Sequence, residues 1–307
     1  MYYNFNPFDY LDKSSRMQKI KWCFLLIACS SIHSSNAQDH ARSYGVWGRF
    51  TSGKPDFVYV DTAIVRDKPD VGGRRLDTLY AGDTVAVVRA MTEELELKGI
   101  EAPWLEIRYR KRGTARKGFI WSGLLALKQM RLPDAAFLVG IDRVVGTRDV
   151  IRGEETYRWA HHFGVKAFRD GRMVDRNTTI LNDIGYLDIE GGVVPAVPGL
   201  RNVKGRVGFT TRPEMSVMGA VTCEYLWTGD RLVPLPLQTN SSEAGAGYHK
   251  ESLNLPGTKG VPDQTLVWTS EEGLETGKKD SKGKPVYKFT RREKKYTWDG
   301  ERLTPVK

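Results

Sequence analysis

Cysteine is scarce in this chain, with three among 307 residues. Cys23 and Cys29 lie near the N-terminus, and Cys223 is alone in the rest of the sequence. A single thiol cannot form an intramolecular disulfide, which excludes a disulfide framework in the body of the protein.

Long apolar stripes with helical spacing are also lacking. Instead the chain has 31 glycines, 8 tryptophans and 13 tyrosines. Frequent turns and aromatic residues favour strands over helices. With 40% apolar and 27% charged residues, the body is globular rather than disordered, and we predict an all-β fold.

The longest apolar run, residues 22–28, is too short to cross a bilayer as a permanent helix. Lys19 and Lys21 precede it, and a polar stretch after it leads to the small residue Ala37. This order is typical of a secretory signal peptide. We therefore expect residues 1–37 to be removed and the protein to be periplasmic or extracellular.

Two alternatives remain open in this segment. Leu26-Ile27-Ala28-Cys29 has the form of a lipobox, in which Cys29 becomes a lipidated N-terminus that anchors the protein to the envelope membrane. Residues 1–16 precede a second methionine, Met17, so we expect translation to start there; the alternative is a cytoplasmic tail on an anchored protein.

Acidic residues are fewer than basic residues, 37 against 47, and the formal net charge is +10. Such a balance favours contact with anionic polymers. Because we expect export, we predict no nucleic-acid partner, and contact with a membrane only through the lipid anchor.

Short alternating segments separated by turns occupy residues 56–126, a pattern typical of a small β-barrel. The order and spacing of its motifs resemble the bacterial Src-homology-3 domain. The matching segments are Ile64-Val65-Arg66 with Pro69, Leu79 with Gly82-Asp83, Trp104-Leu105-Glu106-Ile107, and Gly118-Phe119-Ile120.

The resemblance implies a barrel in which Trp104 and Phe119 are largely buried, and recognition of a cell-wall polymer or a protein. Three departures weaken the inference about ligands. Ile64 replaces the usual asparagine, Trp121 follows the final aromatic position, and residues 91–103 form a loop longer than usual.

Residues 131–307 resemble no family that we can name, and we predict a second β-rich domain of repeated hairpins, arranged as a sandwich or like a propeller. Trp227-Thr228-Gly229-Asp230-Arg231-Leu232 recurs as Trp298-Asp299-Gly300-Glu301-Arg302-Leu303, with a fainter copy from Phe168 to Met173. Each copy is typical of a hairpin. We also expect a long loop over residues 238–264 and a hairpin tip over residues 278–285.

Candidate catalytic groups are weak. Cys223 lies in the middle of an alternating strand, where a buried and unreactive thiol is expected. His161 and His162 point to opposite faces of a strand and cannot share one metal ion. The loose acidic group Asp183, Asp188 and Glu190 is best explained as solvated turn residues. We predict no catalytic site, no metal site and no cofactor.

The most distinctive feature is a basic hairpin in the first module. We expect a non-catalytic protein of the cell envelope that binds or scaffolds, with an anionic envelope polymer or another envelope protein as partner. A solvated edge is the alternative for the hairpin, and an envelope hydrolase with its active site in the C-terminal domain is the alternative for the protein. The candidate binding residues are Arg108, Tyr109, Arg110, Lys111, Arg112, Arg116 and Lys117.

Overall fold

The computed structural model describes residues 42–43, 54–151, 154–182, 188–212, 219–243 and 247–306. Strands make up almost all of its regular structure, which confirms the all-β prediction. In these segments no helix is both long and apolar enough to pass through a membrane. The predicted signal peptide and Cys29 lie outside the described residues.

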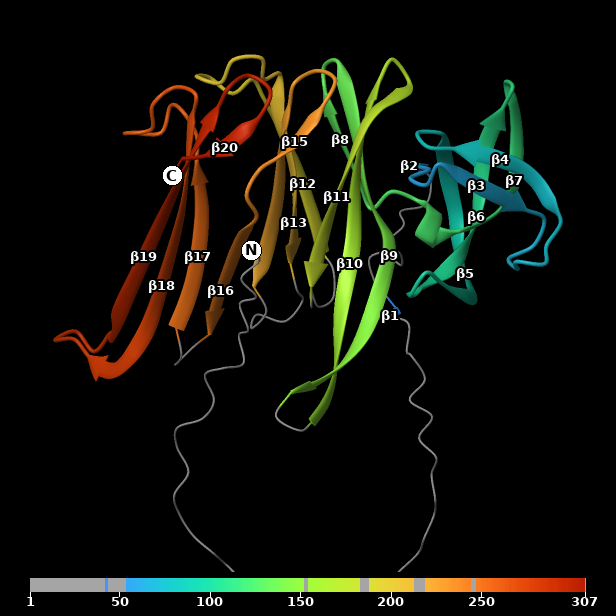
Figure 1. Ribbon diagram of the computed structural model, residues 1–307. Helices are drawn as coiled ribbons and strands as arrows, with labels where there is room; N and C mark the ends of the chain where they lie inside the picture. The colour runs from blue at the N-terminus through green and yellow to red at the C-terminus, as the bar shows by residue number, and fades with distance from the viewer. Residues whose placement is uncertain are drawn as a thin grey trace, which may run out of the picture. The chain divides into compact units, whose positions relative to one another are not determined.

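The first sheet curls into a half-barrel, drawn in blue and teal in Figure 1. Its strand order is β2-β5-β6-β7-β3-β4, and the short β1 pairs in parallel with β6. A single turn of 3-10 helix, Ser122–Leu124, follows the last strand. The strands are β1 (Arg42–Ser43), β2 (Pro55–Phe57), β3 (Thr62–Arg66), β4 (Arg75–Tyr80), β5 (Thr84–Leu97), β6 (Ile100–Lys111) and β7 (Thr114–Trp121).

Alternation along β6 gives the half-barrel an apolar inner face. Leu105, Ile107 and Tyr109 are buried there, and each alternates with a more exposed residue. They form one cluster with Val65, Leu79 and other buried residues of the neighbouring strands. The half-barrel, strands β2–β7, therefore has a core of its own.

The predicted loop over residues 91–103 is wrong. The strands β5 and β6 continue through it as a hairpin, which turns at Lys98 and Gly99. Both of these residues have positive φ, 58° and 71°, as a two-residue turn of this kind requires. The alternating Glu-Leu-Glu-Leu before the turn is the signal for this extension, and Leu95 and Ile100 pack into a hydrophobic cluster on the outer face of the half-barrel.

The rest of the chain forms two further antiparallel sheets. The order of the four-stranded sheet is β11-β10-β9-β8, and that of the larger sheet is β12-β13-β14-β16-β17-β18-β19-β20, with β15 paired to β14. The strands are β8 (Lys128–Leu132), β9 (Ala135–Ile151), β10 (Glu154–Arg169), β11 (Arg172–Asn182), β12 (Asp188–Pro195), β13 (Gly205–Arg212), β14 (Ala220–Trp227), β15 (Leu232–Pro234), β16 (Gln238–Glu243), β17 (Gly247–Asn254), β18 (Thr265–Lys279), β19 (Pro285–Trp298) and β20 (Leu303–Pro305).

One hydrophobic cluster joins all three sheets. Phe163 of β10 lies 5.3 Å from Phe209 of β13 between ring centroids, and Phe137 of β9 lies 5.3 Å from Trp227 of β14. Ile100 and other residues of the half-barrel's outer face belong to the same cluster. Residues Asp39–Lys307 form one compact unit, and the domain boundary between residues 126 and 131 stays a prediction.

The burial that the resemblance predicted for Trp104 and Phe119 is only partly correct. Trp104 is buried as expected, but it lies on the outer face of the half-barrel, in the shared cluster. Phe119 is only half-buried, because its register partner is Glu106 and it borders the cluster. Trp121 is opposite Trp104, is 2% exposed, and donates its indole N–H to the carbonyl of Ala102 at 2.9 Å.

The repeated motif does form hairpins. Trp227 pairs with Leu232 at the start of β15, and Trp298 pairs with Leu303 at the start of β20. The faint copy turns at Asp170 and Gly171 between β10 and β11. The predicted tip at residues 278–285 is confirmed, with a turn in which Asp280 accepts backbone N–H groups.

The predicted loop over residues 238–264 is also wrong, because β16 and β17 occupy most of it. Their residues are polar, which hides the strand pattern from periodicity. Side chains complete the pairing: the Asn240 side-chain oxygen accepts the Glu251 N–H at 3.1 Å, and the Gln238 side-chain oxygen accepts the Leu253 N–H at 3.2 Å.

Candidate functional site

The basic hairpin of the first module is the end of the β6–β7 pair. Lys111 pairs with Thr114, so its two-residue turn is Arg112-Gly113. Both turn residues have positive φ, 49° and 80°, which matches the twist of a tight hairpin. The register then decides which of the basic side chains share a face.

Three of the predicted binding residues face the strand β4. The Tyr109 hydroxyl donates to the Asp77 carboxylate at 2.7 Å, and the Arg116 guanidinium forms an ion pair with the same carboxylate at 2.8 Å. Lys111 donates to the carbonyl of Thr78 at 2.7 Å. These side chains connect the hairpin to β4, so their role is structural.

This arrangement changes the ionisation of Asp77. The hydrogen bond from Tyr109 holds the pKa of the Asp77 carboxyl below its usual range, and Arg116 adds to the effect. Burial, together with the hydrogen bond to Asp77, raises the pKa of the Tyr109 hydroxyl. The cluster therefore favours a charged Asp77 and a neutral Tyr109.

The other four predicted residues are exposed. Arg108 is directly opposite Lys117, and Arg110 follows Arg108 on the same face of β6. Arg112 lies at the turn beyond them. Within the described segments no carboxylate pairs with any of the four. We call this set, Arg108, Arg110, Arg112 and Lys117, the cation row.

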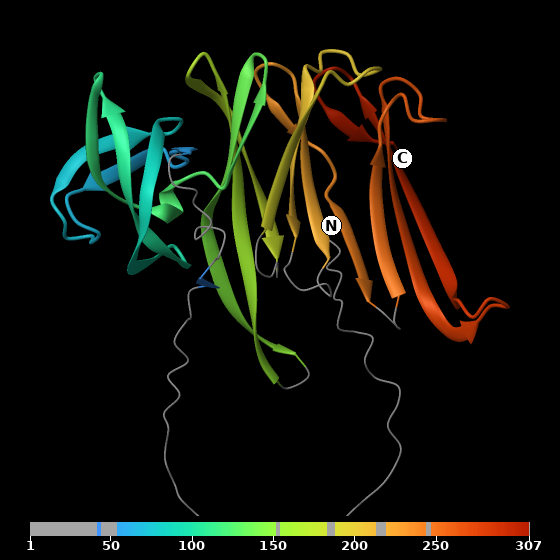
Figure 2. The ribbon, with the colours of Figure 1, turned by 180° about the vertical axis from the view of Figure 1, so that it is seen from behind.

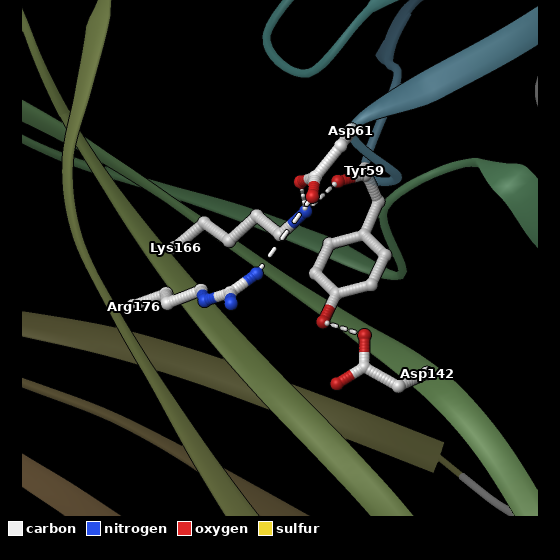
Figure 3. A network of polar contacts seen from close by, with 5 residues as sticks. All are labelled: Tyr59, Asp61, Asp142, Lys166 and Arg176. Atoms are coloured by element: carbon white, nitrogen blue, oxygen red, sulfur yellow. Dashed lines mark hydrogen bonds and ion pairs between the residues drawn. The ribbon is translucent and has the colours of Figure 1, made fainter.

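A second polar cluster, which the sequence analysis missed, connects the half-barrel to β9 and β10 (Figure 3). Lys166, only 5% exposed, donates to the Tyr59 carbonyl at 2.8 Å and to Asp61 at 2.5 Å. Its ammonium also lies 4.7 Å from the centroid of the Tyr59 ring. A buried lysine is tolerated only with such partners. Arg176 adds a longer ion pair to Asp61, at 3.7 Å.

The far end of the Tyr59 ring is also fixed. Its hydroxyl donates to Asp142 at 2.8 Å, and burial is the main cause that raises the pKa of this hydroxyl. The ring packs on Gly140 and Gly164, which are register partners in β9 and β10, and any Cβ at either position would overlap with it. Two glycines in paired strands are the one sequence signal that could have indicated this close approach.

An open depression of about 690 Å³ adjoins this cluster. It contains Asp142, which is the extra residue of a β-bulge, because His162 pairs with Arg143 and Phe163 with Ile141. Burial is the main cause that lowers the pKa of His162, and the positive charge of Arg143 lowers it further. The lining is Lys98, Asp142, Arg143, Val144, Val145 and His162.

None of the residues that line the depression carries a hydroxyl or a thiol, and the groups there that could act in covalent chemistry are Lys98, Asp142 and His162. Bulges often redirect a side chain toward a function. Here the redirected carboxylate of Asp142 accepts the Tyr59 hydroxyl, so it helps to hold the half-barrel in place.

Cys223 is the buried apolar residue that its position predicted. It is 1% exposed, and burial raises the pKa of its thiol to about 12. His249, the histidine that follows Cys223 in the sequence, lies 3.1 Å from the Glu251 carboxylate on β17. A neutral thiol is a poor nucleophile, so this geometry gives Cys223 no catalytic activation.

The remaining candidates do not assemble into a site. His161 is buried and stacks against Phe163, whereas His162 borders the depression. Over the part of the chain that the structure describes, no three His, Cys, Asp or Glu residues are placed to hold a metal ion. Asp183 lies outside the described residues, and Glu190 is exposed on β12.

Comparisons with protein-family models, with curated proteins and with solved structures found no match to this chain. The site must therefore be judged on its own geometry. The cation row is exposed and charged, and it lies on the paired strands β6 and β7, so it is the candidate binding site.

Proposed function

We propose that the protein is an exported, non-catalytic component of the cell envelope that uses its half-barrel to bind an anionic envelope polymer. The resemblance of residues 56–126 to the bacterial Src-homology-3 domain and the signal-like segment near the N-terminus support this proposal. An acidic surface of another envelope protein would bind through the same cations.

The observation that carries the proposal is the division of the basic hairpin into two faces. Tyr109, Lys111 and Arg116 are committed to Asp77 and Thr78. The cation row, on the outer side, has no such partners among the described residues, so its charges are available to a ligand. The pairing of β6 with β7 brings these cations close together, which raises the local positive potential.

The proposed test is binding to purified wall polymers and lipopolysaccharide by the complete chain and by a charge-reversal variant. The variant carries Arg108→Glu, Arg110→Glu and Lys117→Glu, and leaves Arg116 in place because that residue pairs with Asp77. We expect the variant to lose binding, and the unaltered protein to bind more weakly as salt rises.

A matched control separates the patch from net charge. Lys278→Glu, Lys282→Glu and Lys284→Glu change the charge by the same amount at another exposed hairpin tip. We expect this control to bind anionic polymers as the unaltered protein does. Equal losses in both variants, or no loss in the first, would contradict the proposal.

A further inference from the structure

Three aromatic side chains gather on one face of the terminal strands. Tyr248 of β17 and Phe289 of β19 are both register partners of Gly273 in β18, and Tyr287 is two residues before Phe289. We call Tyr248, Tyr287 and Phe289 the aromatic face. It spans β17 to β19, strands of the terminal part of the sheet that Figure 2 shows from behind.

The rings are close together; Phe289 is exposed, and Tyr248 and Tyr287 are half-buried. Their centroids are 5.8 Å apart for Tyr248 and Tyr287, 6.4 Å for Tyr248 and Phe289, and 6.3 Å for Tyr287 and Phe289. Phe289 is 53% exposed. A Cβ on Gly273 would lie 2.5 Å from the Tyr248 ring, so the missing side chain lets this ring lie across the middle strand.

The position of the Tyr248 ring is fixed by polar contacts. The Tyr248 hydroxyl and the Glu271 carboxylate form a hydrogen bond, and Arg291 forms an ion pair with the same carboxylate at 2.6 Å. The Tyr248 ring, held in this way, loses little conformational freedom on binding.

The same face of β17, β18 and β19 carries little net charge. The register places four cations on it, Lys250, Lys279, Arg291 and Lys295, and three carboxylates, Glu271, Glu275 and Glu293. Arg291 pairs with Glu271, and Lys295 pairs with Glu293 at 3.5 Å. A polyphosphate or another polyanion would gain little here, whereas an uncharged ligand with many hydroxyl groups fits the balance of donors and acceptors.

We propose that the aromatic face binds a neutral polysaccharide. Sugar rings present C–H groups with partial positive charge, and the negative faces of aromatic rings attract them. Asn240 and Ser242, the register partners of Lys250 and Tyr248, add hydrogen-bonding groups beside the rings. The core of a protein–protein interface is usually depleted in lysine, glutamate and serine, which are frequent here.

This site is independent of the proposed function, because it shares no residue with the cation row and requires no net charge. Its binding is expected to resist salt, whereas binding to the cation row is expected to weaken. Failure of one proposal therefore leaves the other testable.

The test measures retention of the complete chain on cellulose, chitin and starch, and binding to a single-stranded oligonucleotide. The variant Tyr287→Ala with Phe289→Ala removes two rings, which is expected to lower retention by roughly tenfold. Tyr287→Phe with Phe289→Tyr keeps both rings and is expected to retain binding. Val286→Ala removes an exposed apolar group from the opposite face and serves as the matched control.

We expect retention on at least one of the three polysaccharides, unchanged from about 0.1 M to about 1 M salt, where exposed charges are screened. Unchanged melting of the double alanine variant shows that its loss of retention is not a loss of folding. The proposal is overturned if no polysaccharide retains the protein, if removal of the rings leaves retention unchanged, or if the rings are needed only for the oligonucleotide.

Discussion

The half-barrel and the terminal strands β16–β19 are both antiparallel, yet they are stabilised in opposite ways. In β6 the inner residue Leu105 and the outer residue Trp104 are both buried, each in a different cluster. In β19 only the last residue, Trp298, is buried. The middle of β6 is covered on both faces, whereas β19 leaves most of its side chains exposed.

This difference indicates where stability and binding are located. Burial of apolar area is the main favourable contribution to folding, so the residues around the shared cluster should dominate the free energy of unfolding. The terminal strands contribute Leu266 and Trp298 to a smaller apolar cluster, and their more exposed stretches rely on side-chain hydrogen bonds and ion pairs, each of which contributes little. Their exposed side chains remain available for a ligand.

The largest expected effect comes from Trp121, at the point where the half-barrel meets the shared cluster. Trp121→Ala should lower the free energy of unfolding by about 3–5 kcal/mol, because it removes a buried ring and the hydrogen bond to Ala102. Phe289→Ala, at an exposed ring, should cost less than about 1 kcal/mol. Urea denaturation compares the two variants, and similar losses would remove the distinction between the regions.

The next effect concerns the close approach of Tyr59 to the strands β9 and β10. Gly164→Ala should cost about 1–3 kcal/mol, because the new methyl group overlaps the Tyr59 hydroxyl. In the double variant with Tyr59→Phe that overlap is reduced, so the combined loss should be smaller than the sum of the two single losses. A double-mutant cycle measured by thermal denaturation checks this, and strict additivity would show that the two groups do not meet.

A smaller effect depends on pH. The pKa of Asp77 is lowered in the folded state, so its contribution to stability is present above its unfolded pKa of about 3.9 and is lost as pH falls through the folded value. Asp77→Asn should therefore cost about 1 kcal/mol or less at pH 7, because the site is near the surface. Denaturation of both proteins between pH 7 and pH 2 should show the difference shrinking below about pH 4. A difference that stays constant over this range would exclude an ionic role for Asp77.

The smallest effect is expected in the cation row. Reversal of Arg108, Arg110 and Lys117 should change the free energy of unfolding by less than about 0.5 kcal/mol, because exposed charges without fixed partners contribute little. Arg116→Glu, which breaks the ion pair with Asp77, should cost more than the triple reversal. If differential scanning calorimetry gives the reverse order, the division of the hairpin into two faces is wrong.

The sequence predicted those parts of the fold that have strong local signals. Alternation and turn residues indicated the strands of the half-barrel and the hairpin at Trp298, and the lone Cys223 was correctly expected to be buried. Polar strands such as β16 and β17 were missed, because the side chains that stabilise them show no hydrophobic period. The contacts of Tyr59 with Lys166 were out of reach, since they join residues 107 positions apart.

The sequence identified the basic residues of the candidate site, but not which of them share a face or have partners. The cluster of basic residues in β6 and β7 was plain from composition. Asp77 lies on β4, 39 positions before Arg116, and its contacts decide which of these basic residues have a partner. Register across a hairpin and contacts with a distant strand are set by tertiary packing, so composition alone could not separate Arg116 from Lys117.

One measurement tests the central claim, that the charged hairpin and the aromatic face bind separately and by different forces. The complete chain is applied to a column of an anionic envelope polymer and to a column of the neutral polysaccharide that retains it best, and salt is raised on both. We predict elution from the anionic column as salt exceeds about 0.15 M, where the screening length falls to about 8 Å, and continued retention on the neutral column. Elution from both columns at the same salt concentration, or retention on both, would contradict the account.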